Sequence, residues 1–114
     1  MAIFRGTSAK NRMVGGAFGD TWEWDGTAWH RVSAGGTSNP LPRSYGVFAY
    51  DSIRQRIVLH GGFPGGPVML NDTWEWNGLA WRRLGSTAPR ARRLAAGAFD
   101  SSRAAVLLIG GNNG

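Results

Sequence analysis

The sequence predicts an all-β protein made of repeated four-stranded antiparallel units, and three observations lead to this fold class. The phrase DTWEWDGTAWHRV at 20–32 returns as DTWEWNGLAWRRL at 72–84, with nine of thirteen positions identical at an offset of 52. A second stretch, RSYGVFAYDSIRQRIVLHGG at 43–62, returns as RRLAAGAFDSSRAAVLLIGG at 92–111, at an offset of 49. The chain also holds 18 glycines and six tryptophans in 114 residues and lacks the apolar spacing of a helix, which favours short strands joined by turns.

Within one repeat, four segments have the length and composition of strands. The first is YGVFAYD at 45–51, and the second is RIVLHGG at 56–62, whose continuous apolar run indicates a strand buried on both faces. The third is DTWEW at 72–76 and the fourth is LAWRRL at 79–84. The short linkers between them, SIRQ and NG, are typical of hairpins. The repeat therefore predicts a four-stranded antiparallel unit.

A tight turn is predicted between the third and fourth strands. NG in one copy and DG in the other both favour a two-residue type I′ turn, because its central residues need positive φ. That turn would place Trp76 opposite Leu79, and Trp74 opposite Trp81. We expect the tryptophans to pair across strands and to cover one face of the unit, which must then pack against a neighbouring unit.

The two flanking copies are incomplete. In the first, the first strand is missing or reduced to AIF, the second shrinks to NRMVGG, and a three-residue loop, 17–19, precedes the tryptophan hairpin. The last copy stops after its second strand. We therefore expect one domain, 1–114, with repeat parts at 3–33, 43–84 and 92–111, or about two units.

The repeat resembles the kelch repeat, which forms one blade of a β-propeller. The resemblance rests on a period near 50, a Gly-Gly doublet that closes the second strand, and two tryptophans at fixed spacing. The motif is similar to the variant found in bacterial kelch-like chains. The residues that match this motif are Gly15, Gly16, Trp24, Trp29, Gly61, Gly62, Trp76, Trp81, Gly110 and Gly111. The resemblance implies a propeller built from such blades. It also implies protein interaction, which is the commonest use of kelch propellers.

Composition excludes several classes of function. There is no cysteine, so disulfides, thiolate chemistry and cysteine-based zinc sites are excluded. The net charge is +6, but no aromatic-interleaved RNA-binding signature or helix-turn-helix accompanies the arginines, so we favour a solvated basic surface over nucleic-acid binding. No apolar run is long enough to span a bilayer and no secretory signal is visible, so we expect no membrane partner and a soluble protein, cytoplasmic by default.

The polar residues are interpreted as structural. His60 occupies a predicted strand and His30 a surface position, while the carboxylates that open the third strand recur in each copy, as scaffold residues do. Arg43 and Arg92 also recur, and we expect them to bind carboxylates or backbone between blades. No catalytic triad, phosphate-binding loop or metal-ligand cluster can be assembled. The cross-linked cysteine of kelch-like copper oxidases is absent, so we expect no enzyme activity, cofactor or metal.

Two functions remain. As a protein-interaction module, the chain would use the loops 33–42, 63–70 and 85–91, which share one face of such a blade. The candidate binding residues are Phe63, Val68, Met69, Arg43, Arg90 and Arg92. The apolar members of this set could instead pack on the next blade. The alternative is a lectin-like module in which exposed tryptophans stack on sugars.

The incomplete copies also predict self-association. One chain's C-terminal strand pair could complete the N-terminal blade of the next chain, and this contact makes a ring if the rotation closes. Two blades per chain give six blades in a trimer, which we favour, or eight in a tetramer. The rival explanation is that the chain is a piece of a longer propeller.

Overall fold

The computed structural model describes residues 13–14, 17–85 and 89–112, and every regular element in these ranges is a β-strand. The strands are β1 (Met13–Val14), β2 (Ala17–Phe18), β3 (Thr21–Trp24), β4 (Trp29–Ser33), β5 (Val47–Asp51), β6 (Arg56–Gly62), β7 (Leu70–Trp76), β8 (Trp81–Leu84), β9 (Ala96–Asp100) and β10 (Ala105–Ile109). All pair in antiparallel fashion. The predicted all-β antiparallel class is therefore confirmed. No helix in the described residues is long and apolar enough to cross a membrane.

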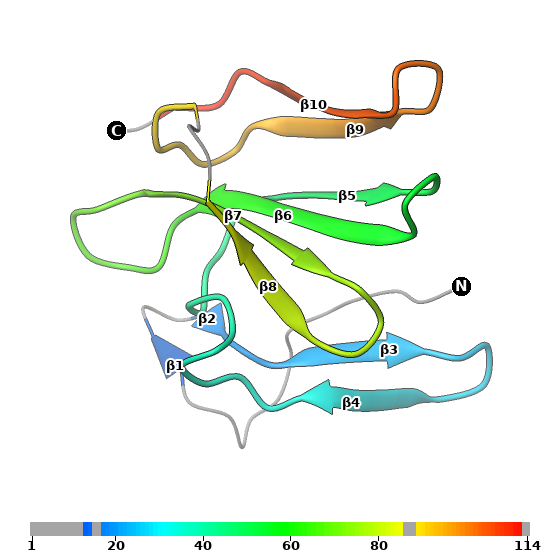
Figure 1. The fold of residues 1–114 in the computed structure, drawn as a ribbon. Coiled ribbons are helices and arrows are strands. Elements are labelled where there is room, and N and C mark those ends of the chain that lie inside the picture. The colour runs from blue at the N-terminus through cyan, green and yellow to red at the C-terminus, as the bar shows by residue number, and fades with distance from the viewer. Residues whose placement is uncertain (1–12, 15–16, 86–88, 113–114) are drawn as a thin grey trace.

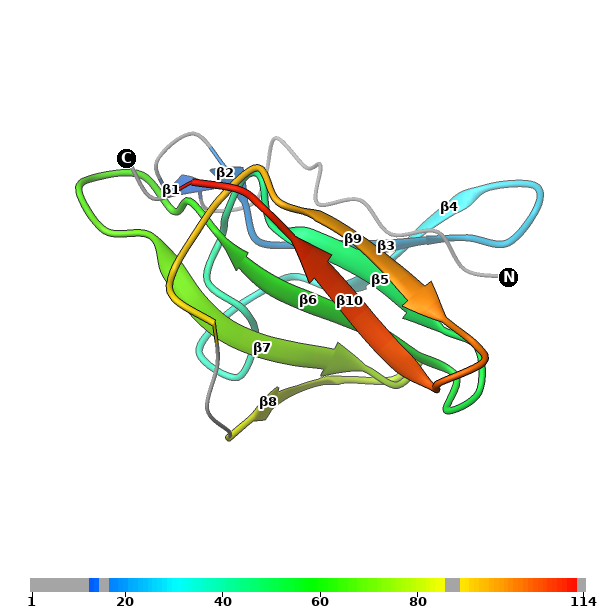
Figure 2. The same cartoon turned by 90° about the horizontal axis from the view of Figure 1, so that it is seen from above.

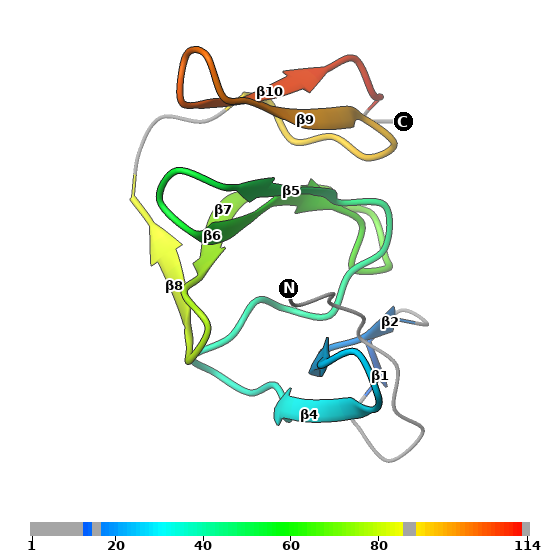
Figure 3. The same cartoon turned by 90° about the vertical axis from the view of Figure 1, so that its right-hand side faces the viewer.

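Three layers follow one another along the chain (Figure 1). The meander β5-β6-β7-β8 forms a four-stranded sheet, here called the central sheet. The N-terminal hairpin, β3–β4, and the C-terminal hairpin, β9–β10, are separate two-stranded sheets. Figure 3 shows these hairpins on opposite faces of the central sheet, and Figure 2 shows the C-terminal hairpin lying over β5 and β6. A complete unit thus lies between two half-units.

The apolar core belongs to the central sheet. Strand alternation divides its buried residues between two faces. Ile57, Trp74 and Trp76 face the N-terminal hairpin, while Val47, Ala49 and Val58 lie on the other face. On the second face the layers are in tight contact, because a Cβ added at Gly97 of β9 would overlap the Cγ1 of Val47.

The repeat is visible in the backbone itself. Tyr45 and Leu94 both have φ of 61°, and Gln55 and Ala104 have φ of 55° and 50°. Each pair is separated by the 49 residues of the sequence repeat. A left-handed conformation is uncommon for residues other than glycine. Because this conformation recurs at matching positions, the backbone before the first strand and in the turn has the same conformation in β5–β6 and in β9–β10.

The predicted register of the tryptophan hairpins is wrong. Trp76 lies opposite Trp81, and in the first copy Trp24 lies opposite Trp29, with ring centroids 5.5 Å apart in both pairs. The connection has four residues, 77–80, because the Asn77 side-chain oxygen accepts the N–H groups of residues 79 and 80, at 2.8 and 2.9 Å. A type I′ turn needs positive φ at both central residues, and only the glycine has it.

Asp25 forms the equivalent turn in the first copy, where its carboxylate accepts the N–H groups of Thr27 and Ala28. Hydrogen bonds from these backbone groups, with His30 adding to them, lower the pKa of Asp25 to about 2. His30 is exposed, as predicted, and its Nε2 lies 2.7 Å from that carboxylate. Side-chain capping, rather than the dipeptide alone, therefore sets the loop length and the register.

Element boundaries also differ from the sequence prediction in places. The second strand begins and ends as predicted, but the third begins two residues earlier, at Leu70. The expected loop 17–19 is not wholly a loop, because Ala17 and Phe18 form β2 and pair with β1. The expected first strand of this copy, and the doublet Gly15-Gly16, lie outside the described residues.

Candidate functional site

The loops that were predicted to share a face leave the same end of the molecule. At the left in Figure 1 lie the connections 34–46 and 63–69 and the described residues 89–95. We call these three segments the loop face. The tight turns between β3 and β4, β5 and β6, β7 and β8, and β9 and β10 lie at the opposite end. Because strands hold the ends of each loop, side chains from three separate segments are brought to one surface.

Backbone and ring contacts hold the loop face together. Phe63 exchanges backbone hydrogen bonds with Ser44 at 2.7 and 2.8 Å, and the guanidinium carbon of Arg93 lies 4.9 Å from the centre of the Phe63 ring. Phe63 and Met69 are half-buried, whereas Val68 is 65% exposed. Of the three apolar residues predicted here, only Val68 is available as a broad contact surface.

Sequence reasoning missed other apolar residues of this surface. Leu41, Tyr45 and Leu94 are all exposed on the loop face, and Leu94 N–H donates to the carbonyl of Tyr45 at 3.1 Å. Tyr45 and Leu94 are the two left-handed residues at the strand starts, and such strained positions gather at functional sites. No local signal marked Tyr45, because it continues the alternation of Val47 and Ala49 and was predicted inside the first strand, whereas β5 begins at Val47.

Arg43 forms its contacts within the central sheet. Its side chain is 5% exposed, and its two terminal nitrogens donate to the carboxylate of Asp72 at 2.6 and 2.9 Å. It also donates to the carbonyls of Gly61 and Leu41, both at 3.0 Å. The predicted partners, carboxylate and backbone, are confirmed. Their predicted location between units is wrong for Arg43, because Asp72 and Gly61 lie in the same sheet.

Arg90 and Arg92 lie in the last segment of the loop face. Arg90 is exposed, and its carbonyl accepts the Nε–H of Arg92 at 3.0 Å. Arg92 also donates to the carbonyl of Gly110 at 2.9 Å. These two contacts copy the contacts of Arg43 with Leu41 and Gly61. Arg92 is therefore held in position like its counterpart, and among the described residues it has no ion pair.

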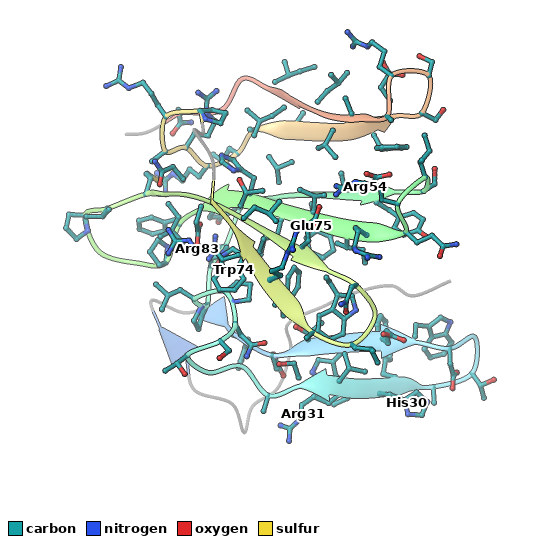
Figure 4. The ribbon with its side chains drawn as sticks, viewed as in Figure 1. His30, Arg31, Arg54, Trp74, Glu75 and Arg83 are labelled. Atoms are coloured by element: carbon teal, nitrogen blue, oxygen red, sulfur yellow. The ribbon has the colours of Figure 1, made fainter. Side chains whose placement is uncertain are left out.

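A second ionic cluster lies at the turn end of the central sheet. Arg54 bridges Asp51 and Glu75 with nitrogen–oxygen distances of 2.6 Å, and both carboxylates are buried (Figure 4). Backbone and side-chain hydrogen bonds from Arg54 lower the pKa of Asp51 against the effect of its burial. A polar groove of about 460 Å³ opens beside this cluster, lined by Arg54, Arg56, Glu75, Asn77, Ala80 and Arg82.

His60 is the remaining polar candidate of the sequence analysis that lies inside the central sheet. His60 lies in β6 as predicted, and its Nδ1 is 2.8 Å from the hydroxyl of Thr73. Burial lowers the pKa of His60, which favours a neutral imidazole. Within the described ranges, no group of three or more histidine, aspartate or glutamate residues could hold a metal ion.

No family model matches the chain, and no curated protein matches its sequence.

Proposed function

We propose that the chain is a non-catalytic protein-interaction module made of kelch-like propeller blades, and that it assembles with copies of itself through shared blades. One observation carries this proposal. A complete four-stranded sheet lies between a hairpin equivalent to its last two strands and a hairpin equivalent to its first two. Such a stack leaves half a blade at each side of the chain.

The half-blades leave sheet edges without partners in the described residues. β3 pairs only with β4, and β10 pairs only with β9. Unpaired strand edges favour pairing with another chain. Two blades per chain require an even total, so a trimer with six blades is favoured and a tetramer with eight is the alternative.

The loop face is the surface that we assign to a protein partner. Leu41, Tyr45, Val68 and Leu94 present exposed apolar side chains there, and Arg90 is exposed in the same segment as Leu94. Exposed apolar groups rimmed by polar residues are typical of interaction sites. The lectin-like alternative has weaker support, because Trp74 and Trp76 are buried and Trp29, at 37%, is the only exposed tryptophan.

Light scattering on the purified chain tests the assembly. We expect a native mass of three or four chains that falls on dilution, with the circular dichroism of a β-protein. A well-folded monomer across the accessible concentration range would overturn the assembly. A glycan array tests the alternative, since specific sugar binding that survives Val68→Ser would favour the lectin-like function over the loop-face interaction.

A further inference from the structure

An ion pair inside the central sheet provides a template for a contact between chains. Arg43, just before the first strand, holds Asp72 at the start of the third strand with a two-pronged contact. The indole N–H of Trp74 donates to the same carboxylate at 2.7 Å. Each complete unit therefore needs an arginine from its first half and an aspartate from its second half.

Among the described residues, the N-terminal hairpin carries the aspartate of this pair and no arginine is bound to it. Asp20 corresponds to Asp72, and its Oδ2 accepts the indole N–H of Trp22 at 2.7 Å, as in the template. Asp20 is only 4% exposed, yet its Oδ1 is buried and has no hydrogen-bond partner. A buried carboxylate oxygen without a partner is costly, so this position requires a donor.

The C-terminal hairpin carries the arginine without its aspartate. Arg92 makes the two backbone contacts that position Arg43, at 3.0 and 2.9 Å, and no carboxylate of the described residues pairs with it. The two halves of one ion pair are thus present in one chain, and the hairpins that follow them lie on opposite faces of the central sheet (Figure 3).

A second ion pair of the central sheet is also divided between the two hairpins. In the central sheet, Arg54 of the β5–β6 turn reaches both Asp51 and Glu75. In the C-terminal hairpin, Arg103 keeps the first contact, to Asp100 at 2.7 Å, and has no second carboxylate among the described residues. The counterpart of Glu75 is Glu23 of β3, which forms no ion pair in the described residues.

We propose that Arg92 and Arg103 of one chain bind Asp20 and Glu23 of a second copy, so that β9–β10 and β3–β4 together form one four-stranded sheet. This inference rests on the proposed assembly and names the contacts that make it. The free edge of β10 would then meet the free edge of β3 in the register of β6 and β7. In that register, residue 106 lies opposite residue 24 of the second copy, and residue 108 lies opposite residue 22.

Among the described residues, no strand lies beside β3 on the side away from β4, because β1 pairs with β2 and β3 pairs only with β4. A second copy fits better than an unrelated strand for two reasons. It supplies arginines at both required positions, and these arginines are spaced as in the sheet whose geometry they would reproduce.

The test uses two complementary variants. Asp20→Asn removes the acceptor charge but keeps an oxygen for Trp22, and Arg92→Met removes the donor. Because each change leaves a buried charge without its partner, we expect each variant alone to weaken the contact by at least about 100-fold. Light scattering should then show monomers at a concentration where the wild-type chain is assembled.

Mixing the two variants gives the decisive result. The Asp20→Asn chain still offers Arg92, and the Arg92→Met chain still offers Asp20, so an equimolar mixture should form a 1:1 dimer through one intact contact. Arg83→Ala removes an equal charge from an exposed site and should keep the wild-type mass. If either variant fails to fold in a thermal melt, Arg103→Ala and Glu23→Gln provide the same complementary pair at the second contact.

The outcomes separate the two proposals. A wild-type oligomer whose mass is unchanged by all of these variants would overturn the contact and leave the assembly standing. Folded variants that stay monomeric after mixing would also overturn the contact. A wild-type chain that is a monomer throughout would overturn the assembly itself, and the contact with it.

Discussion

Replacing Arg43 with methionine should strongly destabilise the fold. In the structure, its side chain and that of Asp72 are 5% and 11% exposed, and two nitrogen–oxygen contacts of 2.6 and 2.9 Å join them. Methionine fills much of the same volume but donates no hydrogen bond. The carboxylate of Asp72 would then stay buried without a cationic partner, although the indole N–H of Trp74 would still donate to it.

The expected size of the effect follows from this burial. Removing one partner of a buried ion pair costs about 3–5 kcal/mol of unfolding free energy, because the other charge stays buried. For a domain of this size, that corresponds to a fall in the melting temperature of about 10–20 °C. Arg83→Met makes the same chemical change at an exposed position and should cost less than about 0.5 kcal/mol.

The pH dependence gives this prediction a second, independent readout. Burial alone would raise the pKa of Asp72, but hydrogen bonds from Arg43 and Trp74 lower it overall. The wild-type contribution is therefore complete above the unfolded value of about 3.9 and is lost as the pH falls through the lower folded value. In the variant, Arg43 no longer opposes the effect of burial on the pKa of Asp72, so protonation of Asp72 relieves part of the penalty. The stability difference should shrink on acidification.

Urea unfolding followed by tryptophan fluorescence, at one fixed protein concentration, measures both effects. A loss below about 1 kcal/mol at pH 7, or a difference that grows as the pH falls, would refute the assigned role of the ion pair.

Three further changes test other parts of the fold. Gly62→Ala should cost about 1–3 kcal/mol, because φ is 108° and the new Cβ would lie 2.8 Å from a carbonyl oxygen, whereas Gly85→Ala, in open space, should be nearly neutral in the same urea titration. Trp76→Ala should cost about 3–5 kcal/mol because Trp76 is 2% exposed, while Leu79→Ala, at 87% exposed, should leave the melting temperature within a degree or two. Burial lowers the pKa of His60, so the unfolded chain binds a proton first and stability should fall as the pH drops below about 6.5. His60→Gln should flatten that part of the pH profile, and an unchanged profile would contradict the assignment.

The sequence was most informative where a single local signal decided the structure. The second strand was predicted at its observed bounds, because its apolar run ends at a glycine doublet that can turn the chain. The register of the next hairpin was missed, because the side chain of Asn77 competes with the backbone preference of its dipeptide. Competition of this kind depends on a rotamer, which the residue type does not specify.

The ion pairs could be foreseen only in part. Arg43 and Asp72 each stood out because they recur, but they lie 29 residues apart and nothing local links them. A comparison of the copies contains the missing signal, since Asp20 is the counterpart of Asp72 and Arg92 is the counterpart of Arg43, and neither aligned copy shows both residues. The exposed apolar residues of the loop face were harder to foresee, because exposure depends on how the layers stack.

The connections at the two ends of the molecule differ in how far their length varies between the repeats. At the turn end, Asp51 and Asp100 accept N–H groups of the following turn in the same way, and each turn has a left-handed residue at the same place. At the loop end, the connection from β4 to β5 is two residues longer than that from β8 to β9, and the two repeat offsets, 52 and 49, also differ. Insertions and new binding sequences can therefore enter at the loop end without disturbing the strands. This freedom makes the chain suitable as a scaffold on which loops are exchanged.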